Sequence, residues 1–94
     1  MTLATSSCLE DLASNQLRSA LQRCNNSVET FPDQPEPWRD RSLVQTLLGQ
    51  QDQACRDVEQ AIALMDDRAD PMLRHELTVR QATCKQRRTI TGKD

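Results

Sequence analysis

Apolar residues recur along this chain at helical spacing, and polar breaks divide the pattern into five segments. The clearest segment is 16–29, where the apolar side chains follow the i, i+3, i+4, i+7 spacing of one helix face. These side chains are Leu17, Ala20, Leu21, Cys24 and Val28. The same reasoning predicts further helices over about 8–14, 36–48, 53–66 and 71–87. Glycines and β-branched runs are few, so the pattern predicts an all-α chain without a β-sheet.

Helix-starting and helix-ending residues stand at the borders of these segments. Ser7 precedes Glu10 by three positions, which is the spacing of a capping box. Gly49 follows the third segment, where a left-handed C-cap is favoured. Asp70 followed by Pro71 is typical of an N-cap and a first helical position. The breaks therefore support the same five antiparallel helices as the apolar pattern.

The chain also repeats itself with a period of 34 residues. When 35–68 is aligned beneath 1–34, and 69–94 beneath both, Leu9, Leu43 and Leu77 fall in one column. A period of this length is typical of stacked helical hairpins.

Trp38, Gly49, Ala54 and Ala61 occupy positions of the tetratricopeptide (TPR) pattern within 35–68. The chain therefore resembles a TPR array of about two and a half repeats. The resemblance implies a short α-solenoid in which 35–68 is the central repeat. The length of 94 residues predicts a single domain, 1–94, and we expect the tail from about 88 to be disordered.

Other positions depart from the TPR pattern. Arg41, Gln45 and Asp66 stand where the family has Leu, an aromatic residue and Pro. An unrelated helical bundle that happens to repeat is the alternative.

Four cysteines form two pairs that are symmetric about predicted turns. The midpoint of Cys8 and Cys24 is residue 16, and the midpoint of Cys55 and Cys84 is 69.5. Residues equidistant from the turn of an antiparallel helix pair lie at the same height, so we predict disulfides Cys8–Cys24 and Cys55–Cys84. Four buried free thiols are the alternative. Such disulfides would place the protein in a periplasm or extracellular space, and free thiols would be compatible with the cytoplasm.

Composition and motifs argue against several function classes. The net charge of −2 does not favour nucleic acid as a partner, and no stretch approaches the ~18 apolar residues of a membrane span. The single histidine, His75, has no neighbouring catalytic partners, and no Cys-x-x-Cys pair or phosphate-binding glycine loop is present. We therefore expect no catalytic site, metal or cofactor.

The remaining interpretation is a protein-interaction module or adaptor in an envelope or secretion assembly. In TPR proteins the first helix of each hairpin lines a concave groove, and Leu43 and Leu47 occupy such positions here. We predict that both leucines contact a protein or peptide partner, with Trp38 and Arg39 at the rim. The alternative is a disulfide-stabilised structural protein whose groove is the interface of a homodimer.

Overall fold

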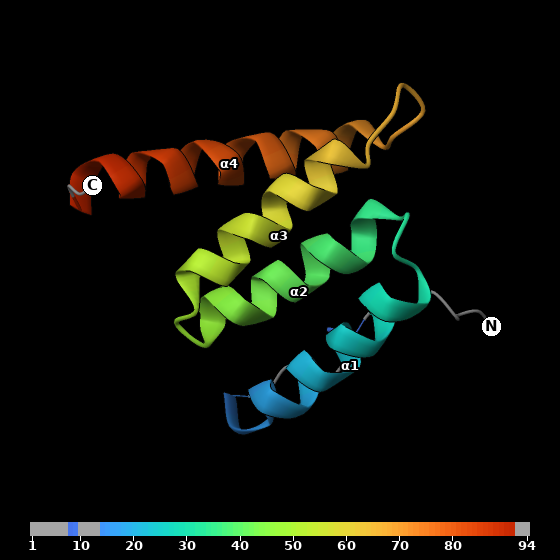
Figure 1. Cartoon of the computed structure of the whole chain (residues 1–94), viewed down its shortest axis with the longest axis vertical. Helices are drawn as coiled ribbons and strands as arrows, with labels where there is room; N and C mark the ends of the chain where they lie inside the picture. Colours follow the sequence, from blue (N-terminus) through green and yellow to red (C-terminus); the bar gives the residue numbers. More distant parts are fainter. Residues whose placement is uncertain (1–7, 10–13, 92–94) are drawn as a thin grey trace.

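The computed structural model describes residues 8–9 and 14–91, and helices account for most of this part of the chain. A 3-10 turn, η1 (Ser14–Gln16), leads into α1 (Leu17–Thr30), α2 (Pro35–Leu47), α3 (Gln51–Ala63) and α4 (Pro71–Thr91). No strand occurs among the described residues. The all-α prediction is therefore confirmed. Each helix packs against the next along the chain, in the order in which Figure 1 colours them.

The described residues contain four α-helices, so the predicted count of five is wrong for this part of the chain. The predicted helix over 8–14 falls largely outside the described residues. Of this segment the structure describes only a turn at 8–9 and Ser14, where η1 begins. At the other end, α4 continues to Thr91, beyond the predicted end near 87.

The turn between α2 and α3 depends on Gly49. Its φ of +82° lies in the left-handed region, which a glycine adopts without steric cost. The Gly49 backbone N–H donates to the Thr46 carbonyl at 3.1 Å, and the Gln50 N–H donates to the Gln45 carbonyl at 2.8 Å. This pair of bonds is the Schellman arrangement that closes a helix end, as the position of the glycine predicted.

The apolar interior consists of two small clusters, one on each side of α2. The first joins the N-terminal segment, α1 and α2, and contains Cys8, Ala20, Cys24 and Val44. The second joins α3 and α4, and contains Val58, Ala61, Leu73 and Leu77. Neither cluster is large, and small domains with such cores commonly depend on disulfides for part of their stability.

Candidate functional site

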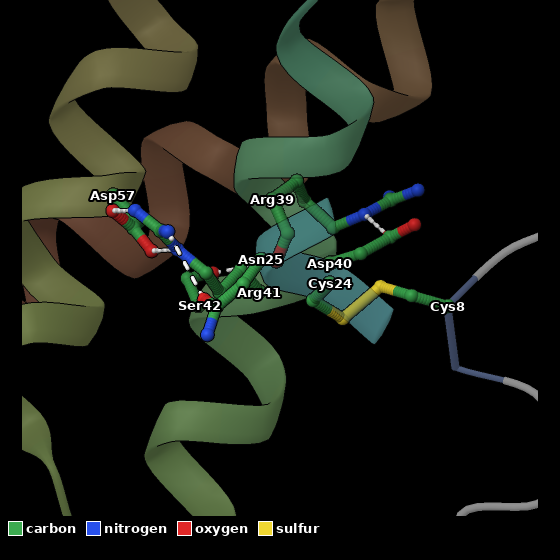
Figure 2. Close-up of a disulfide and its surroundings, with 8 residues drawn as sticks. All are labelled: Cys8, Cys24, Asn25, Arg39, Asp40, Arg41, Ser42 and Asp57. Atoms are coloured by element: carbon green, nitrogen blue, oxygen red, sulfur yellow. Dashed lines mark hydrogen bonds and ion pairs between the residues drawn. A yellow bond between two sulfur atoms is a disulfide. The ribbon is translucent and has the colours of Figure 1, made fainter. Parts of the chain in front are cut away.

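Two disulfides connect the helices, and their pairing is the one predicted from the sequence. Cys8 and Cys24 are joined across the first turn with a Cα–Cα distance of 5.0 Å, and Cys55 and Cys84 join α3 to α4 at 5.9 Å. Cys8 and Cys24 are buried within the first core cluster, whereas Cys55 and Cys84 are half-exposed. The first bridge lies beside Asp40 of α2 (Figure 2).

Three residues at four-residue intervals form an accessible row along α2. We call Arg39, Leu43 and Leu47 the α2 strip. Leu47 is 59% exposed, Leu43 is half-buried, and neither leucine belongs to a core cluster. Leucines in such positions are available to a partner, so the structure leaves both predicted contact residues accessible.

One side of the α2 strip is bordered by α4. Arg39 Nη1 donates to Glu76 Oε1 at 2.9 Å, and the Arg80 guanidinium donates to the hydroxyls of Ser42 and Thr46. At about 100° per residue, Ser42 and Thr46 lie on the helix face next to Leu43. Polar side chains therefore hold α4 along this border.

The other side of the α2 strip is bordered by the first core cluster. Val44 lies about 100° around the helix from Leu43, and it packs in the cluster that contains Cys8 and Cys24. The strip consequently lies between α4 and the N-terminal disulfide.

Trp38 already has partners within the chain. Its indole Nε1 donates to the Pro32 carbonyl at 3.1 Å, and its ring packs against the second core cluster. The guanidinium carbon of Arg41 lies 5.1 Å from the ring centroid, within the range of a cation–π contact. Trp38 thus helps to fix the start of α2, and its predicted role at a partner's rim stays a prediction.

Arg39 is likewise engaged by two carboxylates. Besides Glu76, its Nε lies 2.6 Å from Asp40 Oδ1. Partial burial lowers the pKa of Arg39, but Asp40 and Glu76 outweigh that effect and raise it overall. The side chain therefore remains a cation that connects α2 to α4, and contact with a partner would have to compete with these bonds.

A second polar contact, between α2 and α3, was not predicted. Arg41 donates to both carboxylate oxygens of Asp57, at 2.7 and 2.9 Å, and to Asn25 of α1 at 3.2 Å (Figure 2). The sequence held a signal for it, because 41 and 57 are equidistant from Gly49, as each cysteine pair is from its own turn.

The other residues considered in the sequence are His75 and the four cysteines. His75 is exposed, and no group of three His, Cys, Asp or Glu side chains is arranged there to hold a metal ion. All four cysteines are in disulfides. None of the described helices combines the length and the hydropathy needed to cross a membrane.

Comparisons with protein-family models, with curated proteins and with solved structures find no significant match to this chain. The geometry of the α2 strip is therefore the basis on which a function can be proposed.

Proposed function

We propose that this chain is a non-catalytic protein-interaction module of the TPR-like type, and that its α2 strip holds an apolar segment of a partner protein. The observation that carries the proposal is the exposure of Leu47, whose side chain is 59% exposed. Leu47 is in line with Leu43 along α2. On one side the two leucines are bordered by the polar contacts between α2 and α4, and on the other by the core cluster that contains the Cys8–Cys24 disulfide. An accessible row of apolar side chains with polar edges is the usual form of a surface that binds an extended or helical segment.

The arrangement of α2 and α3 supports the TPR-like part of the proposal. The two helices form a hairpin around Gly49, and Ala54 and Ala61 are buried on the same face of α3. Small residues at such positions allow helix axes to approach to about 8 Å. The helix that carries the strip, α2, is then the first helix of a hairpin, which is the one that lines the groove of a stacked array.

The two disulfides support an oxidising location. Such bonds persist in secreted and periplasmic proteins and are rare in the cytosol. We therefore propose a periplasmic or extracellular assembly as the setting in which the partner is met.

Self-association is the second candidate, and exposed apolar side chains on α4 favour it. Met72 is 78% exposed and Val79 is 50% exposed. A second copy of the chain would cover apolar surface of this kind. Light scattering over a range of concentrations separates the two candidates, because an interaction module stays monomeric and a homodimer dissociates on dilution.

The decisive test is the double variant Leu43→Ser/Leu47→Ser, with Met72→Ser as its matched control. Both changes replace exposed or half-exposed apolar side chains outside the core clusters. The double variant should keep its far-UV helicity and melting temperature and should lose capture of a partner from the native envelope or extracellular fraction, while Met72→Ser should retain capture. Unfolding of the double variant would show that the leucines are core residues. Undiminished capture by a folded double variant would place binding elsewhere.

A further inference from the structure

The two disulfides of this chain differ in how easily a thiol in solution can reach them. Cys8 is 5% exposed and Cys24 is fully buried, and both belong to the first core cluster. Cys55 and Cys84 are half-exposed, and neither core cluster of the described residues contains them. Disulfide exchange requires direct contact between the incoming sulfur and one sulfur of the bridge. Accessibility therefore decides which bridge reacts in the folded protein.

A cavity beside the second bridge provides the access. It lies between the end of α2, the start of α3 and the middle of α4, and its volume is about 230 Å³. Cys55 and Cys84 both belong to its lining, and so does Arg80. A space of about 10–15 Å³ already holds one water molecule, so a cavity of this size admits the –CH2–S⁻ group of a small thiol.

The two sulfurs of this bridge are not equivalent as leaving groups. Arg80 precedes Cys84 by four residues on α4, and side chains at this spacing are neighbours, with about 5–6 Å between their Cβ atoms. A cation in that position stabilises a thiolate. Cys55 has carboxylates at such spacings on α3, with Asp52 three residues before it and Glu59 four residues after it, and like charges disfavour a thiolate. Cys84 is therefore the better leaving group.

We propose that the Cys55–Cys84 bridge is a site of reversible modification by a small-molecule thiol that enters through this cavity, whereas Cys8–Cys24 is a permanent structural bridge. The inference goes beyond the proposed function, because it does not require a partner on the α2 strip.

The reaction is a thiol–disulfide exchange. The incoming thiolate attacks Cys55 Sγ, so that a new S–S bond forms between them and the bond to Cys84 Sγ breaks. The electron pair of the broken bond leaves with Cys84 Sγ, as a thiolate beside Arg80. One disulfide is consumed and one is formed, so no separate oxidant or reductant takes part. Attack by the Cys84 thiolate on the mixed disulfide restores the bridge and releases the thiol.

Modification should loosen the far part of α4 without unfolding the chain. Near the start of α4, Leu73 and Leu77 pack in the second core cluster, and Glu76 is bonded to Arg39 of α2. These contacts do not involve the bridge, and Cys84 lies beyond them on the helix. Amide hydrogen exchange over 84–91 should therefore accelerate on modification, while exchange over 73–77 stays slow. Equal acceleration in both stretches would show that modification unfolds the chain, and would overturn the proposal.

The direct test uses the disulfide-bonded protein and 2-mercaptoethanol, whose only charge is that of its thiolate. Samples taken early in the reaction are quenched with acid, blocked with N-ethylmaleimide and digested with trypsin, which places the four cysteines on separate peptides. Cys55–Cys84 should open at least tenfold faster than Cys8–Cys24, with mercaptoethanol on Cys55 and maleimide on Cys84. Equal rates, or faster opening of Cys8–Cys24, would overturn the proposal. Mercaptoethanol on Cys84 would overturn the direction of attack.

A measurement in urea separates the effect of the fold from that of the local sequence. When urea unfolds the chain, both bridges become accessible, and their rates of opening should approach each other. A tenfold difference that persists in the unfolded chain would show that the cavity does not cause the selectivity, and would overturn the proposal.

Variants of Arg80 test the leaving group. Arg80→Gln should slow the opening of Cys55–Cys84 severalfold, and Arg80→Lys, which keeps the charge, should restore most of the rate. The matched control is Arg74→Gln on the same helix, where the side chain is exposed and bonded to the Asp66 carbonyl; it should react as the wild type does. An unchanged rate in folded Arg80→Gln would overturn the role of Arg80. The comparison of the two bridges in the wild type tests the site even if Arg80→Gln fails to fold.

Discussion

The ion pair between Arg41 and Asp57 gives the sharpest test of how the helices are held together. The Asp57 side chain is only 7% exposed and that of Arg41 is 20% exposed. Replacing Asp57→Asn preserves the size of the side chain and removes its charge. The Arg41 guanidinium then stays between α2 and α3 without a counterion.

The expected cost follows from burial. Removing one partner of a buried pair destabilises proteins by about 3–5 kcal/mol, and the lower end applies here because Arg41 keeps its contacts with Asn25 and with the Trp38 ring. A domain of this length has a free energy of unfolding of about 5–14 kcal/mol. A loss of about 3 kcal/mol would lower the melting temperature by about 12–24 °C.

Urea unfolding followed by far-UV circular dichroism, without reductant so that both disulfides persist, measures the loss. Asp66→Asn is the matched control, because Asp66 is 65% exposed and lies 3.9 Å from Arg68; an exposed pair of this kind contributes less than about 1 kcal/mol. Equal urea midpoints for Asp57→Asn and the wild type would refute the reasoning.

A double replacement separates the charge from the packing. Arg41→Leu/Asp57→Leu removes both charges, and leucine is the residue that the TPR pattern has in place of Arg41. Apolar replacement of a whole buried pair is often neutral or stabilising. The double variant should therefore unfold at higher urea concentration than Asp57→Asn, and a midpoint at or below that of Asp57→Asn would mean that the site does not accept apolar packing.

Two further predictions concern the turns and the bridges. Gly49→Ala should cost about 1 kcal/mol of unfolding free energy, because alanine is strained at a φ of +82° even though no atom lies within 4 Å of the added methyl group; an unchanged melting temperature would contradict this. Cys55→Ser/Cys84→Ser should lower the free energy of unfolding by about 3–4 kcal/mol, because the unfolded chain is no longer closed into a loop of 29 residues. Calorimetry of the variant beside the wild type measures this loss. A smaller loss of unfolding free energy would indicate residual order in the unfolded chain.

Contacts across a single turn could be predicted from the sequence, because only the turn position is needed. Cys8–Cys24 and Cys55–Cys84 lie symmetrically about their turns, and both form. Arg41 and Asp57 obey the same rule about Gly49. In an antiparallel hairpin the register is fixed by the turn, so residue numbers alone identify facing positions.

Contacts between α2 and α4 could not be predicted in this way. Arg39 and Glu76 are 37 residues apart, and Arg80 and Ser42 are 38 residues apart, with a whole helix between them. Their meeting depends on the angle at which α4 crosses α3, which side-chain packing sets and the residue pattern does not encode. A cavity beside Arg80 was missed for the same reason, because α2, α3 and α4 all contribute to its lining. The lining residues are Thr46, Gln51, Ala54, Cys55, Arg80, Thr83 and Cys84.

The geometry of α3 and α4 explains why a cavity exists beside Arg80. Near their turn the two helices are held by apolar packing of Ala61 with Leu73 and Leu77, and from there they diverge along α4 (Figure 1). The Cys55–Cys84 bridge spans the diverging part, so the helices are fixed at two places, and the cavity borders the second. Apolar packing alone would favour closing this space, because unfilled volume forfeits dispersion contacts. The bridge limits how far the two helices can separate at this point. The half-buried Arg80 guanidinium at the border of the cavity opposes its closure, because a charged group loses hydration when the space around it closes.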